Sequence, residues 1–437
     1  MLAYGSFRTS QLDLQLGGQS GNFGYFATFD NQSSDGHVAN SAYHGDSFTG
    51  RFDYTPARGL DVCLQGKYFA GRKNEPGPLE APLAGYWNDY KRGAIDLSLN
   101  QTGETDDWTL RLYRNFGHHV FSDGWDSDDF TNGLMARVTT RRLPNMVATA
   151  GLDYRYFGGS SAGWPQGDWH KSESALYLHA DWLPKAALVI EGGMRLQFDS
   201  LYGQEACPQA GVVWHITPTL NWRAQVSKGF RSPQLSELYM FPPANAALLP
   251  ERTWNYESGL EANILRNWSI DATIFKMIGS NLITTIPNPG QGFPFILSNT
   301  GTFDFWGLEL GLKGRPLETV HVALSHAFLN AGGLTKGRPG HKWDGSLDLD
   351  LGSIHSHLQG QWVTDYFAAD HSLSHLPNYF ILSARVTLRV WRQLNVNLDL
   401  GNVFNALYLT YAEFPGIASG TYTMPGRHMT LGLNWQL

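Results

Sequence analysis

The chain has 437 residues, of which 16% are charged and 13% are aromatic, and it carries 48 glycines and a net charge of -7. Soluble globular domains contain about 25% charged residues, so this composition is not that of an ordinary soluble protein. Mean hydropathy is nevertheless slightly polar, at -0.28. Sheets that face lipid on one side and water on the other combine low charge with such polarity.

Several protein classes are excluded at this stage. No uninterrupted apolar stretch approaches the ~18 residues of a membrane helix, which excludes a helical membrane protein. No basic run follows the pattern that tracks a phosphate backbone, so we expect no nucleic-acid partner. The first six residues lack a basic region and an apolar region, so we expect no signal peptide in this chain. Cys63 and Cys207 lie in strand-like runs, and two free thiols are expected rather than a disulfide.

Strand patterns fill the chain from its beginning. Residues 1–4 are predicted to be the remnant of a truncated first strand, followed by a tight turn at Gly5 and Ser6. Later runs alternate strictly, as in Trp306, Leu308 and the apolar residues that follow them at every second position. Similar alternation covers residues 380–390, 394–400 and 429–437. Successive side chains of a strand point to opposite faces, so each run has one apolar face and one polar face.

A soluble sandwich could also show this alternation, with its apolar faces turned toward a shared core. Two features favour a barrel instead: the strands are often ten residues or longer, and the connections sort by length. Short connections are predicted at residues 17–22, 55–59, 142–145, 183–185, 217–218, 265–267, 314–316 and 391–393. Long ones are predicted at residues 30–46, 71–91, 115–131, 158–171, 231–251, 280–297 and 411–425. The sequence therefore predicts an all-β fold, a transmembrane antiparallel β-barrel of about 22 strands with short periplasmic turns and long extracellular loops.

The long loops carry most of the candidate site residues. Bulky organic chelates suit aromatic surfaces, and the predicted ligand-binding residues are Trp87, Trp125, Trp164, Tyr239 and Phe241. The alternative for each of them is a place in the aromatic girdle at the membrane interface.

One loop is rich in carboxylates, at Asp123, Asp126, Asp128 and Asp129. Ca²⁺ binds several carboxylate oxygens on flexible backbone, so a structural calcium ion is one interpretation and a solvated acidic loop is the other. No other cofactor is expected.

Histidines also fall in predicted loops, at His118, His119, His371 and His375. Four imidazoles could bind haem or a metal chelate. Their role is left open by the residues themselves. Ser, His and Asp all occur in the chain, but no nucleophile and base stand out as a triad, so we expect no enzyme.

Six local motifs follow one another in an order that resembles the barrel of TonB-dependent receptors. Residues 4–7 with Gly17 and Gly18, and residues 35–43, resemble the start of such barrels and their first long loop. Residues 228–233 resemble the family's Phe-Arg-Ala-Pro element, and residues 245–251 resemble its Asn-Pro-x-Leu-x-Pro-Glu element, with Ala246 where Pro is usual. Residues 401–405 resemble its Asn-Leu-Phe-Asp element, and residues 425–427 open the last strand. From the residues alone, we expect 230–233 and 402–405 mainly to end strands and shape loops.

The resemblance covers the whole chain, residues 1–437, as one barrel domain. It implies uptake of a metal chelate through the bacterial outer membrane, a ferric siderophore first and cobalamin second, by a multi-pass and monomeric protein surrounded by outer-membrane lipid. Family members also carry a plug domain, through which alone they contact TonB, and no plug fits into residues 1–5. We therefore expect a plug in trans or a lost plug. Haem receptors of the family place a histidine between residues matching Phe230 and Asn245, and here there is none. The alternative function is a plugless passive pore or a degenerate structural barrel.

Overall fold

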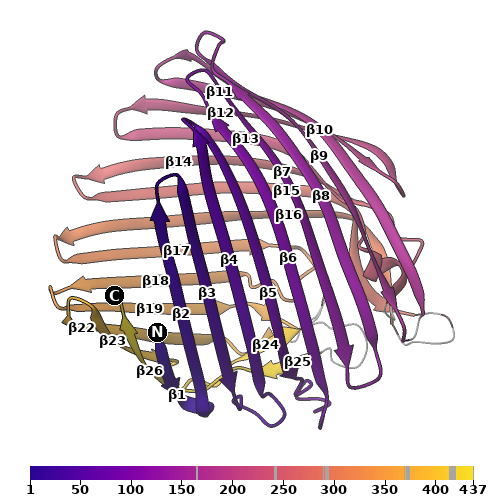
Figure 1. The fold of residues 1–437 in the computed structure, drawn as a ribbon, viewed down its shortest axis with the longest axis vertical. Helices are drawn as coiled ribbons and strands as arrows, with labels where there is room; N and C mark the ends of the chain where they lie inside the picture. Colours follow the sequence, from indigo (N-terminus) through magenta and orange to yellow (C-terminus); the bar gives the residue numbers. More distant parts are fainter. Residues whose placement is uncertain are drawn as a thin grey trace.

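The structure is a computed structural model, and it describes residues 1–163, 166–240, 244–288, 290, 295–368, 370, 375–412 and 420–436. Within these residues, one antiparallel sheet of 22 strands closes on itself (Figure 1). Each strand pairs with the next along the chain, and the first pairs with the last. The prediction of an all-β barrel of about 22 strands is confirmed.

The ring contains strands of 4 to 23 residues. They are β1 (Leu2–Gly5), β2 (Thr9–Ser20), β3 (Phe23–Ser34), β4 (Tyr43–Ala57), β5 (Leu60–Asn74), β6 (Trp87–Thr102), β7 (Asp106–Phe121), β8 (Asp126–Thr140), β9 (Met146–Ser161), β10 (Gly167–Lys185), β11 (Leu188–Asp199), β12 (Gly203–Thr217), β13 (Leu220–Arg231), β14 (Glu251–Leu265), β15 (Trp268–Pro287), β16 (Phe295–Leu317), β17 (Val320–Asn330), β18 (His341–Asp350), β19 (Ile354–Thr364), β22 (Tyr379–Trp391), β23 (Leu394–Gly401) and β26 (His428–Trp435). Two small hairpins lie outside the ring, β20 (Tyr366–Phe367) with β21 (His375–Leu376) and β24 (Leu409–Ala412) with β25 (Gly420–Thr423).

The two faces of the wall differ as the alternation predicts. In β10, Leu176 and Leu178 lie on the outer face, and they are 54% and 59% exposed. Tyr177 and His179, which alternate with them, lie on the inner face. Few apolar side chains of the described residues are buried, and the two clusters that exist are small, around Phe303 and around Val363. A soluble sandwich would bury its apolar faces in a core, so this wall requires an apolar medium around it.

The inner face is polar, and many of its charges are paired with a charge on the neighbouring strand or on the next strand but one. The pairs include Arg111 with Asp96, Arg195 with Asp153, Arg223 with Asp271, Lys228 with Glu205, and Arg385 with Asp399. Cross-strand partners of opposite charge stabilise a sheet and leave the interior hydrophilic.

Connections at one end of the barrel are all short, for example residues 21–22, 58–59, 186–187 and 318–319. The other end carries the longer connections, including residues 35–42, 75–86 and 331–340. Strict alternation in length does not hold at this end, where residues 6–8 (η1, Ser6–Arg8), 122–125 and 200–202 are also short. Residues predicted as loop, such as 115–121 and 126–131, instead continue the strands β7 and β8.

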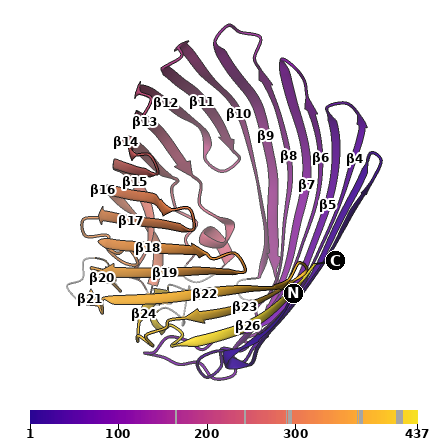
Figure 2. The ribbon, with the colours of Figure 1, turned by 90° about the vertical axis from the view of Figure 1, so that its left-hand side faces the viewer.

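The ring closes between β26 and β1, where the two chain ends lie side by side (Figures 1 and 2). Four residues of β1 pair with β26 on one side and with β2 on the other. The amide N–H of Met429 donates to Ser6 Oγ at 3.0 Å, which extends the seam by one further contact. No helix among the described residues is long and apolar enough to cross a membrane.

The two faces of β17 give a direct test of which side meets lipid. Leu324 lies on the outer face, and its neighbour Ser325 lies on the inner face opposite Asp344. Arginine on the lipid-facing side near the bilayer centre costs about 2–4 kcal/mol. We expect Leu324→Arg to lower stability in phospholipid vesicles by that order, and Ser325→Arg to change it little. Urea unfolding followed by tryptophan fluorescence measures both; equal losses would contradict the assignment of faces.

Candidate ligand-binding rim and its inner loop

The segment after β13 turns into the interior of the barrel rather than away from it. β13 ends at Arg231, and Pro233 follows two residues later, where a missing N–H and a fixed φ stop strand pairing. A short π-type helix, η2 (Ser236–Met240), then lies inside the ring of strands (Figure 2). This confirms that residues 230–233 end a strand and shape a loop. We call residues 232–240 and 244–250 the inner loop.

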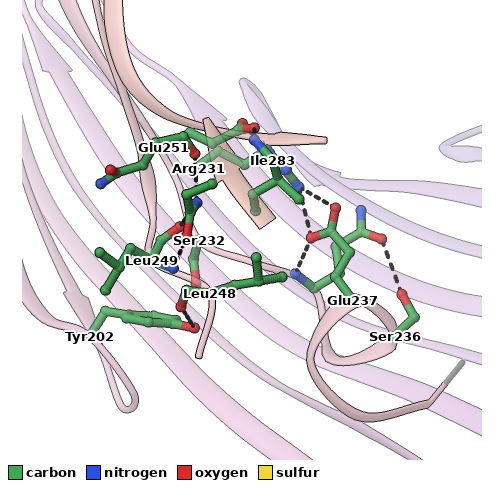
Figure 3. A network of polar contacts seen from close by, with 12 residues as sticks. Tyr202, Arg231, Ser232, Ser236, Glu237, Leu248, Leu249, Glu251 and Ile283 are labelled. Carbon is green, nitrogen blue, oxygen red and sulfur yellow. Dashed lines mark hydrogen bonds and ion pairs between the residues drawn. The ribbon is translucent and has the colours of Figure 1, made fainter. Parts of the chain in front are cut away.

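Arg231 fixes the start of the inner loop (Figure 3). Its guanidinium donates to the Glu251 carboxylate on β14 and, at 3.0 and 3.1 Å, to both oxygens of Glu237 in η2. Glu237 also accepts from the amide of Gln234 at 2.7 Å, and Glu251 accepts from the amide of Ile283 at 2.8 Å. One cation thus joins the helix to two strands of the wall.

The second half of the inner loop is held by side chains that satisfy its backbone groups. Asn245 donates through Nδ2 to the carbonyl of Leu297 at 2.8 Å, and its Oδ1 accepts from the amide of Ala247 at 2.9 Å. Leu248 is 2% exposed, and its carbonyl accepts from the Tyr202 hydroxyl at 2.9 Å. Burial raises the pKa of Tyr202 to about 12, so the hydroxyl stays protonated and keeps donating at neutral pH. Asn299 donates through Nδ2 to the carbonyl of Leu249 at 2.9 Å.

A buried lysine lies where the inner loop meets the wall. Lys171 on β10 and Asp199 on β11 both have fully buried side chains, and Nζ lies 2.7 Å from Oδ2. Lys171 also contacts Glu173 at 3.2 Å and donates to the Ser232 hydroxyl at the start of the inner loop. Tyr202 covers the ammonium at 5.4 Å from its ring centroid. Three polar partners and an aromatic face compensate for burying this charge.

Tyr239 is the predicted ligand-binding residue that the inner loop carries into the barrel. Its ring stacks on Trp169 of β10, with centroids 6.1 Å apart and planes 5° apart. Two segments some seventy residues apart in sequence therefore build one aromatic surface beside the lumen. Stacked rings of this kind suit a flat or aromatic ligand group.

The other predicted aromatic residues have different surroundings. Trp87 begins β6, where the Arg72 guanidinium lies 4.1 Å over its ring. Trp125 is only 7% exposed and donates through Nε1 to Ser127 Oγ at 3.0 Å, so its ring packs within its own turn. Trp164 and Phe241 lie outside the described residues. A ligand role for these residues stays a prediction.

The predicted calcium residues do not converge. Asp123 accepts from the Tyr86 hydroxyl at 2.7 Å, and Asp129 pairs with Arg92 at 2.7 Å. Asp126 and Asp128 share one face of β8, where His118 Nδ1 lies 3.6 and 3.1 Å from their oxygens. Within the part of the chain that the structure describes, no three of these carboxylates come within reach of one ion. The reason is that these residues belong to a strand, in which alternation turns Asp129 to the opposite face from Asp126 and Asp128.

The remaining histidines are also spread over the rim. His119 packs against Tyr90 with ring centroids 4.8 Å apart, and His375 packs against Phe367 at 4.2 Å. His371 lies outside the described residues. The described imidazoles do not form a joint haem site.

A second group of contacts crosses the seam of the barrel at the same end. Glu80 accepts from the amide of Thr421 in β25 at 3.0 Å and from its hydroxyl. His37 Nε2 lies 2.8 Å from the carbonyl of Thr423. The hydrogen bond from the Thr421 hydroxyl lowers the pKa of Glu80, whose carboxylate is the accepting form. Loops from the strands on both sides of the short strand β1 thus contact each other at this end of the barrel.

A family model described as TonB dependent receptor-like, beta-barrel, matches residues 10–406. The chain belongs to this family. An iron-regulated outer membrane virulence protein of Vibrio cholerae, known from two strains, is 24% identical over 294 residues, which are 59% of this chain and 43% of that protein. The chain thus matches less than half the length of these curated relatives.

Solved structures of the same architecture superpose over nearly the whole chain. The FrpB iron transporter of Neisseria meningitidis has a TM-score of 0.84 at 14% identity, and 99% of this chain covers 80% of it. The copper transporter OprC has a TM-score of 0.83 at 14% identity, over 100% of this chain and 79% of that one. The siderophore receptor PirA of Pseudomonas aeruginosa has a TM-score of 0.81 at 14% identity, over 98% of this chain and 76% of that one. At such identities the likeness shows the fold.

Sequence reasoning found the Arg231 and Asn245 elements through their resemblance, and it missed Lys171, Asp199 and Tyr202. No local motif marks these three. Their partners come from separate strands, and only the register of the sheet brings them together.

Removing the buried cation should destabilise the protein strongly. Lys171→Met leaves the fully buried Asp199 carboxylate without its ammonium, whereas Glu173 keeps Arg155 as a partner, and breaking a buried pair costs about 3–5 kcal/mol. Urea unfolding in vesicles measures this loss. The double variant Lys171→Met/Asp199→Leu should recover part of it. If Lys171→Met alone unfolds like the unchanged protein, the ion pair does not hold the rim.

The contact of Glu80 with Thr421 should weaken in acid. Because the pKa of Glu80 is lowered in the fold, its contribution to stability is complete above the ordinary glutamate value of about 4.3 and disappears as pH falls through the lower folded value. The amide resonance of Thr421 should therefore titrate with a midpoint below about 4.3. Glu80→Gln should abolish that titration, and a midpoint at or above the ordinary value would contradict the contact.

Proposed function

We propose that this chain is the ligand-conducting barrel of a TonB-dependent receptor in a bacterial outer membrane, and that it admits a metal chelate. A ferric siderophore is the first candidate and cobalamin the second. The observation that carries the proposal is a closed, outwardly apolar ring with a charged inner wall, inside which a structured loop stacks Tyr239 on Trp169 of the wall.

Three features support this proposal over a purely structural barrel. Arg231, Asn245 and the buried Lys171 hold the inner loop by specific contacts with three strands, β13, β16 and β10, which a mere connection would not need. Aromatic and charged groups lie together beside the lumen, as recognition of a bulky anionic chelate requires. Iron or siderophores appear in the names of the Vibrio relative and of several structural neighbours.

The proposed mechanism divides the work between rim and wall. The rim selects the chelate by stacking and by charge, and the paired inner wall provides a hydrophilic path across the membrane. By analogy with the family, a plug domain supplies the gate and the contact with TonB, and the barrel acts as a monomer without covalent chemistry.

A passive pore is the second candidate. It is favoured by the inner wall itself, because the described residues leave the interior without an apolar core. The two candidates differ in ligand binding at the rim and in closure by a plug.

Planar-bilayer recording of the purified chain separates them. A barrel of this strand number encloses a lumen wide enough to conduct ions, so we expect large, ohmic steps. Under the receptor proposal, adding a plug polypeptide of the family closes these steps. If the steps stay open and no saturable chelate binding is found, the receptor proposal is wrong and the passive pore is supported.

Binding of a ferric tris-catecholate, a ferric trihydroxamate and cobalamin, measured by fluorescence quenching, tests the rim. Removing one stacked aromatic costs about 0.5–1.5 kcal/mol, so Tyr239→Ala should weaken binding of the accepted chelate roughly 2- to 10-fold. Trp391→Ala is the matched control, because Trp391 lies at the opposite end of the barrel and is 70% exposed. Equal effects of both variants would contradict a role of the rim in chelate binding.

A further inference from the structure

Strands β10, β11 and β12 are neighbours in the wall (Figure 1). Six positions on their inner faces form two short rows across the three strands. In one row, His179 pairs with Gly193 and Gly193 with Gln209. In the other, Asp181 pairs with Glu191 and Glu191 with Gly211. Each row contains one glycine and two polar side chains.

The two glycines make room for the polar side chains to meet. A Cβ at Gly193 would lie 3.1 Å from His179 Nδ1 and 3.0 Å from the Gln209 side chain. A Cβ at Gly211 would lie 2.1 Å from Glu191 Oε1. Any larger residue at either position would displace these groups, so the absence of side chains there shapes the cluster.

One ligand atom each of His179, Asp181 and Glu191 lies within 4.8 Å of the others. Asp181 and Glu191 face each other directly across two strands, and like charges in that position repel. Many carboxylates of the wall pair with arginine or lysine instead, as Asp153 does with Arg195 at 2.6 Å. Among the described residues, Asp181 has an ion pair with His179 alone, at 3.0 Å, and Glu191 has none.

The imidazole is already oriented toward the carboxylates. Gln209 Nε2 lies 2.9 Å from His179 Nδ1, on the far side of the ring from Asp181. A half-turn of the Gln209 amide brings Oε1 to this position, so that Nδ1 donates to it and Nε2 is left with a lone pair facing the two acids. Holding the second ring nitrogen in this way is how proteins fix a metal-binding histidine.

We propose that His179, Asp181 and Glu191 bind a divalent first-row transition ion on the inner wall of the barrel. One imidazole nitrogen and two carboxylate oxygens suit Zn²⁺, Fe²⁺, Co²⁺ or Mn²⁺, and three ligands are too few for the six to eight oxygens that Ca²⁺ takes. The ion would cancel the repulsion between Asp181 and Glu191. A cavity of about 250 Å³ beside His179, lined also by Gln209 and Cys207, leaves space for bound water as further ligands.

This site goes beyond the proposed function and does not rest on it. It lies on the wall, apart from the inner loop and the Tyr239–Trp169 stack, and it binds a bare ion rather than a chelate. Failure of chelate binding or of plug closure would therefore leave it untouched, and its own failure would leave them untouched.

Calorimetric titration of the full chain in detergent, without a histidine tag, tests the site with Zn²⁺ and then Co²⁺. We expect one saturable site per chain. His179→Ala and the double variant Asp181→Asn/Glu191→Gln should each abolish it. Gln209→Ala, which removes only the group that orients the ring, should weaken binding ~10- to 100-fold.

His357→Ala is the matched control. His357 also lies on the inner face and pairs with an aspartate, Asp348, at 2.7 Å, but it belongs to no three-ligand group among the described residues. It should leave the titration unchanged. SDS-resistant migration of unheated samples verifies that every variant is folded. No saturable binding by the unchanged chain up to about 1 mM, or unchanged binding by the Asp181→Asn/Glu191→Gln variant, would overturn the proposal.

Discussion

Closure of the backbone hydrogen-bond ring is the constraint on which the rest of this structure depends. In hydrocarbon, an open sheet edge would leave its N–H and C=O groups without partners, so a sheet can span a membrane only as a closed barrel. Here 22 strands close through the pairing of β26 with the four residues of β1. Above that short seam, Glu80 and His37 reach across to β25 and add contacts that the four-residue strand β1 does not supply.

A closed wall also dictates what each face carries. Apolar side chains turn outward, and the charges that alternate with them must find partners inside, mostly from the adjoining strand. At the rim, Lys171 and Arg231 also form ion pairs with carboxylates, and these pairs hold the inner loop and its aromatic residue Tyr239. Asp181 and Glu191 are not paired in this way, because two acids face each other there.

The sequence predicted the wall better than the rim. Alternation of period two depends only on neighbours in the chain, so the two faces of each strand followed from residues such as Trp306 and Leu308. Asp126, Asp128 and Asp129 fall within the loop predicted at residues 115–131, yet they extend β8 beyond the predicted boundary. Lys171 with Asp199, and His179 with Glu191, depend on register between strands, which no local pattern encodes. The space that Gly193 and Gly211 leave for their neighbours is likewise visible only from the cross-strand pairing.

A disulfide across the seam tests closure most directly. Ala3 and Gly432 are direct partners, and a Cβ at Gly432 would lie 3.6 Å from Cβ of Ala3, within the span of about 3.5–4.5 Å that a disulfide bridges. With Cys63 and Cys207 replaced by serine, the pair Ala3→Cys/Gly432→Cys should oxidise nearly completely in the membrane-embedded protein, and Ala3→Cys/Leu433→Cys, whose side chains point to opposite faces, should not. Absence of the first cross-link, or equal formation of both, would contradict a barrel closed in this register.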